Sequence, residues 1–310
     1  MRKRLKLILL IIVLIILGEV LAIFALGLGE QPIYIEDNKY EYMYAPLQGV
    51  KRFGNFILTN EYSMRSLPLK DNENRVLIFG DSVLNGGNLT DHDALATTLL
   101  ENDLQKICNK SIRILNISAG SWGPDNAFSY LQKYGDFNAS SIILVFSSHD
   151  AYDNMKHEKI VGQHLSYPSS QPCCALWDGF NRYFIPRVTA LFSNSKEKFS
   201  KIHKIDQSDT FNTGWKNFID YTKKYNIKLF VVLHPDKQEF ISGQYNKNGI
   251  EIINFLKENN IPYLLELNKI DVTYFRDAIH YNNKGQRFLY EELKPILEKN
   301  ICLTKKDDKL

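Results

Sequence analysis

Long apolar runs are absent from this sequence after residue 28, and cysteine is scarce throughout. The chain has 310 residues, of which four are cysteine. Their spacings match no zinc-binding pattern, and so small a number excludes a compact disulfide scaffold. No Gly-x-Gly-x-x-Gly follows the first predicted strand, which argues against a cytoplasmic dinucleotide- or flavin-binding protein.

The chain after residue 6 also lacks a large excess of positive or negative charge. The formal net charge is +3, but Arg2, Lys3, Arg4 and Lys6 alone supply +4, so the remaining chain sums to −1. The basic balance therefore gives no reason to expect nucleic acid as a partner. With 44% hydrophobic and 24% charged residues, the composition is that of a globular protein and excludes disorder and collagen.

The one long apolar run lies at the N-terminus. Between Leu7 and Leu28 only Glu19 is charged, and this length is close to the roughly 20 residues that cross a bilayer as a helix. The basic residues before it keep the N-terminus in the cytoplasm, so the rest of the chain lies outside, in the periplasm or the extracellular space. A small-x-small pattern at 25–27 leaves a cleavable signal peptide as the alternative, but the length favours an uncleaved anchor. We interpret Glu19 as a tolerated charge rather than a contact with a helix partner.

In such an oxidising compartment the cysteines can form disulfides. Adjacent Cys173 and Cys174 are poorly placed to pair with each other. The sequence leaves open whether one or two disulfides form, with Cys108 and Cys302 as further candidates, or whether the thiols stay free and buried.

The rest of the chain alternates short apolar runs with amphipathic stretches. The runs, which are of strand length, are Val76–Phe79, Ile112–Ile117, Ile142–Phe146, Leu229–Leu233 and Ile261–Leu265. The helical candidates between them lie near 94–107, 124–135, 211–224, 248–258 and 285–299. Continuous apolar strands that alternate with helices predict a mainly parallel five-stranded sheet covered on both faces, a three-layer α/β/α sandwich.

Four segments follow from this pattern. Residues 1–28 are the basic residues and the membrane anchor, 29–74 an irregular lead-in, 75–300 one α/β domain, and 301–310 a charged tail. The interval 150–226 is longer than one crossover helix, and we expect it to hold an insertion beside the site.

Polar clusters follow the predicted strands, at the edge of the sheet where ligands bind in open parallel sheets. Ser82 comes just after the first strand and is the candidate nucleophile. A serine hydroxyl needs a base and a third group that orients the base. His280 can be that base, and Asp277 lies three residues before it, just ahead of the last helix.

These motifs resemble those of the SGNH/GDSL hydrolases, a family of serine esterases and acyl hydrolases. Gly80-Asp81-Ser82 with Gly86 resembles the first block, and Asp277-x-x-His280 the last. The resemblance covers roughly residues 75–299 and implies a flavodoxin-like sandwich. It also implies an oxyanion hole built from the amides of Ser82 and a second-block glycine, for which Gly120 is the best match and Ser121 the neighbouring possibility.

The third block departs from the family pattern. The family places an asparagine donor where this chain has His149. A neutral imidazole still carries one N–H and can replace the amide as a donor. The alternative is a weakened oxyanion hole and a catalytically degenerate domain that binds a glycan or a partner in envelope assembly.

The resemblance and the anchor together imply a membrane-anchored, extracytoplasmic serine esterase with no metal or organic cofactor. The expected substrate is an acyl ester such as an O-acetylated envelope polysaccharide. The same triad serves acyl transfer to a sugar hydroxyl, so the sequence leaves hydrolysis and transfer open.

Overall fold

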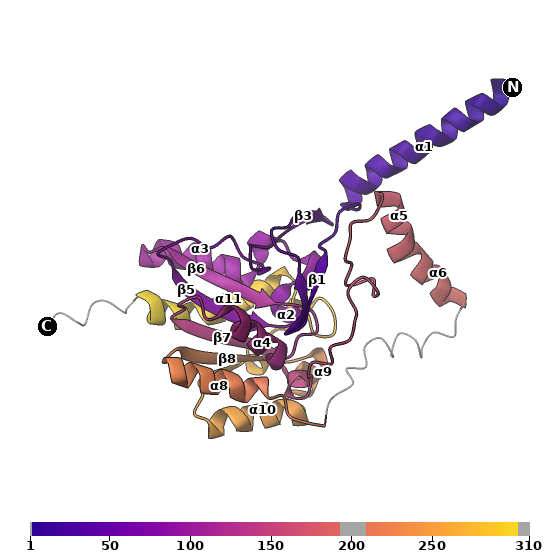
Figure 1. Ribbon diagram of the computed structural model, residues 1–310. Helices are drawn as coiled ribbons and strands as arrows, with labels where there is room; N and C mark the ends of the chain where they lie inside the picture. The colour runs from indigo at the N-terminus through magenta and orange to yellow at the C-terminus, as the bar shows by residue number, and fades with distance from the viewer. Residues whose placement is uncertain (1, 193–208, 303–310) are drawn as a thin grey trace.

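The computed structural model describes residues 2–192 and 209–302, so most of the predicted charged tail lies outside the described residues. A five-stranded parallel sheet forms the centre of the protein (Figure 1). Its strands are β5 (Asn74–Gly80), β6 (Ile112–Ser118), β7 (Ser141–Ser147), β8 (Lys228–His234) and β9 (Tyr263–Leu265). All four neighbouring pairs are parallel, which confirms the predicted fold class.

The strand order is β6-β5-β7-β8-β9. In order along the chain this is 2-1-3-4-5, the flavodoxin-like arrangement, in which the direction of winding reverses between the first and third strands. Here that switch point lies between β5 and β7. Ligands bind in the crevice outside this point, so the loops that leave β5 and β7 are the first place to look for a site.

Both faces of the sheet are covered because the strands are apolar on both sides. Val76 and Ile78 of β5 pack on one helical layer, and Leu77 and Phe79 pack on the other. The first layer contains α3 (Ala96–Cys108) and α11 (Asn283–Cys302). The second contains α4 (Pro124–Tyr134), α8 (Gly214–Tyr225) and α10 (Lys247–Glu258). These five helices match the predicted ones to within a few residues.

The lead-in at 29–74 is more regular than we expected from its sequence. It forms two antiparallel hairpins, one of β1 (Tyr34–Asp37) with β2 (Glu41–Tyr44), and one of β3 (Gly49–Arg52) with β4 (Asn55–Leu58). Each strand has only four residues, too few for a clear alternation of apolar and polar positions. Their side chains pack onto the domain: Met43 and Ile57 are fully buried.

Shorter elements connect the sheet and the layers. They are α2 (Ser82–Asn85), η1 (Gly87–Leu89), η2 (His92–Ala94), η3 (Ser148–Ala151), α5 (Ala175–Gly179), η4 (Phe180–Phe184), α6 (Ile185–Phe192), α9 (Lys237–Ser242), η5 (Glu266–Asn268) and η6 (Val272–Tyr274). A disulfide joins Cys108, the last residue of α3, to Cys302, the last residue of α11. Cys173 and Cys174 are free.

The N-terminal apolar run forms a single helix, α1 (Arg2–Leu26), which is long and apolar enough to cross a membrane. Only its last turns touch the rest of the protein, and it projects away from the domain (Figure 1). The sequence predicts that Glu19 is a tolerated charge without a helix partner, but the structure gives it one. Its carboxylate accepts hydrogen bonds from the amides of Ala175 at 2.6 Å and Leu176 at 2.9 Å.

The long interval between β7 and β8 divides into two parts. Its first part passes along the carboxyl edge of the sheet, where the Tyr167 hydroxyl lies 3.3 Å from the Gly120 carbonyl oxygen. Its second part, from Cys173 onward, packs through α5 against the end of α1 instead of the predicted site, and α6 leads away from α1 (Figure 1).

Candidate active site

Ser82 is the first residue of a short helix just beyond the central strand. β5 ends at Gly80 and α2 begins two residues later. Asp81 caps this helix, because its Oδ1 accepts a hydrogen bond from the Val83 amide at 2.8 Å. No side chain fits at position 80, since a Cβ there would lie 2.7 Å from a carbonyl oxygen of β7. The strand and this tight turn therefore hold Ser82 at the switch point of the sheet.

Three of the predicted site residues form a hydrogen-bonded row. His280 Nε2 lies 2.9 Å from Ser82 Oγ, although the two residues are 198 positions apart. His280 Nδ1 lies 2.9 Å from each carboxylate oxygen of Asp277. A neutral imidazole that donates from Nδ1 to the carboxylate has its lone pair on Nε2, facing the serine hydroxyl. A hydroxyl, an imidazole and a carboxylate thus lie in the order that serine catalysis requires of a nucleophile, a base and a group that orients the base.

The carboxylate of this row is ionised. Burial alone would raise the pKa of Asp277, but hydrogen bonds from the His280 side chain and from the amides of His280 and Ile279 outweigh it and lower the pKa below its ordinary value. An ionised carboxylate keeps the proton of the neighbouring imidazole on Nδ1 and stabilises the imidazolium that forms when the base accepts a second proton.

A closed turn presents Asp277 and His280. Phe275 and Tyr281 pair across its base, and the Arg276 amide donates to the His280 carbonyl oxygen at 2.8 Å. The turn is further fixed to the start of α9 by a hydrogen bond from the Lys237 amide to the Ala278 carbonyl oxygen, also 2.8 Å long.

His234, which ends β8, supports this turn from below. Its side chain is fully buried. Its Nε2 lies 2.7 Å from the Ile279 carbonyl oxygen, and its Nδ1 lies 2.7 Å from Glu266 Oε2. The Tyr281 hydroxyl donates to the same carboxylate oxygen. Glu266 carries no local sequence signal for this role, because its partners come from β8 and from the turn.

Two backbone amides at this edge are open. Within residues 2–192 and 209–302, neither the Ser82 amide nor the Gly120 amide has a hydrogen-bond partner. The Gly120 carbonyl oxygen accepts a hydrogen bond from the Tyr42 hydroxyl at 2.8 Å. Amides of this kind are suited to hold a negatively charged oxygen that forms next to the Ser82 hydroxyl.

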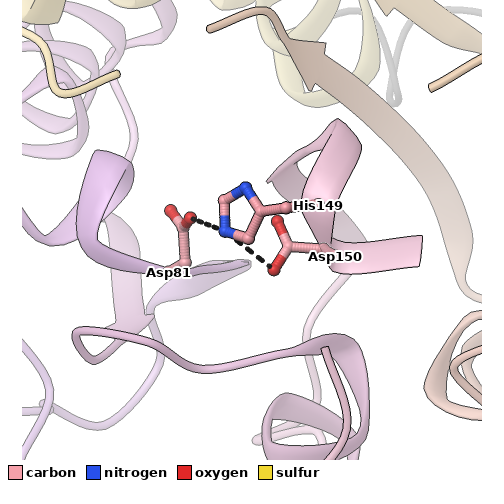
Figure 2. Close-up of side chains that lie close together, drawn as sticks. All are labelled: Asp81, His149 and Asp150. Atoms are coloured by element: carbon pink, nitrogen blue, oxygen red, sulfur yellow. Dashed lines mark ion pairs between the residues drawn. The ribbon is translucent and has the colours of Figure 1, made fainter. Parts of the chain in front are cut away.

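His149 lies across the switch point, in the loop that leaves β7. Figure 2 shows its ring between two carboxylates, with one ring nitrogen facing both. His149 Nε2 lies 3.8 Å from Asp81 Oδ2 and 3.6 Å from Asp150 Oδ1. Both carboxylates are buried, and neither of these two oxygens has a hydrogen-bond partner in the described part of the chain.

The charge state of this cluster follows from its burial. Burial raises the pKa of Asp150 well above its ordinary value, and the nearby Asp81 charge adds to the effect. Burial lowers the pKa of His149, against the opposing influence of the Asp81 and Asp236 carboxylates. At 3.6 Å and 3.8 Å neither contact is a hydrogen bond, and the other ring nitrogen, Nδ1, points away from both carboxylates.

The same three side chains are also a donor set that divalent cations accept. One ligand atom from each of Asp81, His149 and Asp150 lies within 4.8 Å of the others. Two carboxylates and one imidazole are hard or borderline ligands, suited to Mg²⁺, Mn²⁺ or Zn²⁺. Either a proton shared within the cluster or a bound cation would give the two carboxylate oxygens a partner. Removal of metal ions with a chelator distinguishes these two possibilities.

Arg65, from the lead-in, holds the loop that follows Ser82. Its buried guanidinium donates to the carbonyl oxygens of Asn85, Gly87 at 3.0 Å and Thr90 at 3.2 Å. Burial lowers the pKa of Arg65. The sequence did not point to this residue, because an arginine in a polar lead-in has no pattern that distinguishes it from a surface charge.

Two cavities lie beside this loop and extend toward α1. One of about 320 Å³ is lined by Tyr34, Tyr44 and Arg182 and opens at Gly87 and Asn88, just after α2. The other, of about 290 Å³, continues past Arg182 toward Cys173 and Trp177. Both cavities are lined by Gln31, Leu165, Pro168 and Arg182, so they adjoin and form one groove beside the loop that follows Ser82.

Comparison with known proteins gives a limited result. No protein-family model and no curated protein matches the sequence. Solved structures with a similar arrangement include a lipase/acylhydrolase from Enterococcus faecalis, with 12% sequence identity, a TM-score of 0.42, and coverage of 72% of this chain and 96% of that one. They also include the acetyl xylan esterase AlAXEase, with 16% identity, a TM-score of 0.43, and coverage of 72% and 99%.

Proposed function

We propose that this protein is a serine esterase that cleaves or transfers acyl esters outside the cytoplasm. The observation that carries the proposal is the row of hydrogen bonds from Ser82 through His280 to Asp277, with each heavy-atom distance at 2.9 Å. The position of this row at the switch point of a flavodoxin-like sheet adds support, because that is where such sheets bind ligands.

The proposed reaction has two steps. His280 Nε2 takes the proton of the Ser82 hydroxyl while Oγ attacks the ester carbonyl carbon, and the imidazolium then gives that proton to the departing alkoxide oxygen. An acyl-enzyme remains. His280 next takes a proton from water, or from an acceptor hydroxyl in a transfer reaction, while the new oxygen attacks the acyl carbon. The imidazolium then returns that proton to Ser82 Oγ as the acyl–oxygen bond to the enzyme breaks.

The oxyanion of each tetrahedral intermediate needs donors that are already in place. The open amides of Ser82 and Gly120 supply two, and we propose His149 as the third. For His149 to act in this way the donating nitrogen is Nδ1, because Nε2 faces Asp81 and Asp150. Asp150 is then a positioning residue, which lies against the opposite nitrogen of the ring at 3.6 Å.

The proposed location follows from α1. A helix this long and apolar, preceded by basic residues, is proposed as an uncleaved anchor with its N-terminus in the cytoplasm. Its hydrogen bonds through Glu19 to α5 support retention of the helix, since cleavage would remove them. The domain then meets envelope material, and O-acetylated polysaccharide is the proposed substrate class.

A fluorophosphonate probe, which labels only activated serines, tests the nucleophile. We expect the full-length protein to be labelled and Ser82→Ala to lose both labelling and hydrolysis of a short acyl ester, by about 10⁴-fold or more. Ser140→Ala is the matched control, because Ser140 is exposed at the opposite end of β7. Full activity in Ser82→Ala would contradict the mechanism.

The same probe separates the enzyme from a degenerate binding module. A folded wild-type domain that takes up no probe would favour a module that binds glycan or an assembly partner. Incubation with an acyl donor and a glycan, followed by analysis of the glycan for new esters, separates acyl transfer from hydrolysis.

His149 variants test the third oxyanion donor. We expect His149→Ala to lower kcat by about 10²-fold to 10³-fold, the cost of one such donor, and His149→Asn to recover most of it through its amide N–H. A shared proton in the cluster predicts that dialysis against a chelator leaves kcat unchanged. Loss of activity on dialysis, restored by one divalent cation, would instead assign the cluster to a metal.

A further inference from the structure

An exposed aromatic stripe runs along the helical segment 175–192, which we call the arm. The arm consists of α5, η4 and α6 in direct succession. Trp177, Phe180 and Phe184 follow one another at three- and four-residue spacings, so their side chains share one face. They are 50%, 45% and 57% exposed, and their ring centroids lie 6.0 Å and 5.3 Å apart in succession.

The opposite face of the arm is bound to the protein, so the orientation of the stripe is fixed. Ala175 is fully buried, and the buried Asp178 carboxylate pairs with the Arg52 guanidinium of β3 at 2.7 Å. Arg182, one turn further on, lies 3.2 Å from the same carboxylate. These buried contacts hold the aromatic stripe outward, away from the domain.

The arm begins against the apolar helix α1. The Glu19 carboxylate accepts the first two amides of α5, from Ala175 and Leu176, and the Leu176 side chain packs beside Gly18. Glu19 lies about two turns before the end of α1, or roughly 10 Å along the helix axis. Helices that lie in the membrane interface bury their apolar face by a similar depth, about 5–10 Å.

We propose that the arm lies in the interface of the membrane that α1 crosses, on the side away from the cytoplasm, with Trp177, Phe180 and Phe184 inserted among the lipids. This inference depends on α1 spanning the bilayer and is independent of the proposed esterase chemistry. In Figure 1 the arm leaves the end of α1 to one side and stands apart from the sheet and its covering helices. Residues beside the last two turns of a spanning helix meet lipid, and tryptophan and phenylalanine are suited to the membrane interface.

The arm gives the domain a second attachment to the bilayer. A domain that hangs from a single spanning helix is free to tilt and rotate about the residues that follow the helix. A second attachment beside the first restricts this motion, and it holds the groove lined by Trp177, Arg182 and Asn88 next to the lipid surface.

Tryptophan fluorescence tests the proposal on the full-length chain in phosphatidylcholine–phosphatidylglycerol vesicles. The sequence has three tryptophans, and Trp122 and Trp215 are buried in the domain core. Trp177 is therefore the tryptophan that lipid can reach. We expect phosphatidylcholine brominated near the headgroup end of its acyl chains to quench part of the emission, and lipid brominated near the methyl end to quench less.

Trp177→Phe is the matched control and should lose the quenching while it keeps the emission of the two core tryptophans. Phe184→Asp should reduce the quenching of Trp177, because the charge opposes insertion of the stripe. Equal emission of the wild-type protein in brominated and unbrominated vesicles would overturn the proposal, since it would mean that protein rather than lipid covers the stripe. Probe labelling of Ser82 in the same samples reports separately on the active site.

Discussion

Arg65 shows how a residue outside the α/β domain holds the loop that follows Ser82, the proposed nucleophile. Its guanidinium contacts three carbonyl oxygens of the loop that follows Ser82, and its own amide donates to the Asn116 carbonyl oxygen of β6 at 3.0 Å. The planar fork can reach several acceptors at once, which a lysine ammonium cannot do in the same geometry.

We therefore expect Arg65→Lys to lower kcat by about 10-fold to 100-fold with a smaller change in KM, because small displacements of a reacting group are costly. Steady-state hydrolysis and the rate of probe labelling measure the effect. Arg75→Lys is the matched control: Arg75 also binds backbone carbonyl oxygens, those of Lys70 and Phe137, but at the amino end of the sheet. Equal losses of kcat in the two variants would show a general structural effect instead.

Asp153 provides a pH-dependent contribution to stability. Burial and the neighbouring Asp125 carboxylate raise the pKa of Asp153 to about 7. Since the folded pKa lies above the unfolded value of about 3.9, the folded state binds the proton more tightly. The stabilisation is complete below the unfolded pKa and is lost as the pH rises through the folded pKa.

Melting temperatures of Asp153→Asn and of the parent protein should therefore diverge as the pH rises from about 4 to 7. The variant becomes the relatively more stable protein, and the difference levels off above pH 7, where Asp153 is ionised in both states. Asp71→Asn, at an exposed position, is the control substitution. Parallel curves for Asp153→Asn and the parent would contradict the raised pKa.

At the scale of the elements, α3 and α11 are joined at one end by the disulfide. Both helices cover the same face of the sheet, and Cys108 and Cys302 are their last residues. The Lys110 ammonium adds a hydrogen bond to the Ile301 carbonyl oxygen at 2.7 Å. The row of Ser82, His280 and Asp277 lies at the other end of α11, which starts just after His280.

We expect Cys302→Ser, or reduction of the wild-type protein, to lower the free energy of unfolding by about 2–5 kcal/mol, because the bond closes a long loop in the unfolded chain. Thermal unfolding with and without reductant measures this, at roughly 2–4 °C per kcal/mol. Activity at low temperature should be unchanged, since the bond is distant from Ser82. Cys174→Ser is the control, and an unchanged melting temperature in Cys302→Ser would contradict the prediction.

At the scale of the whole molecule, the sheet was predictable and its surroundings were less so. Strands β5 to β8 are continuous aliphatic runs, buried on both faces, so their composition alone indicates them. The hairpins of the lead-in were not recognised, because four-residue strands carry too little pattern. The second half of the insertion was expected beside the site, but it packs on α1 through contacts such as Glu19 to Ala175 that no local sequence pattern reveals.

The residues of the candidate site also divide into those that the sequence predicts and those that it does not. Ser82, Asp277 and His280 belong to short motifs, so the sequence could nominate them, and the structure places them within hydrogen-bonding distance of one another. Arg65, His234 and Glu266 support these residues from distant segments. Their roles depend on which buried carbonyl or carboxylate they meet, and that information exists only in the folded chain.

The separation of Ser82 and His280 by 198 positions has a consequence for the synthesis of the protein. In the proposed topology the chain leaves the cytoplasm in order from α1 onward, so Ser82, the proposed nucleophile, emerges long before His280, its proposed base. Cys302, which closes the disulfide, emerges later still. A partly exported chain thus carries a serine that nothing activates, and it cannot attack esters of the membrane in which it is being made. The protein would become active only when export is nearly finished, so its activity would indicate that export is complete.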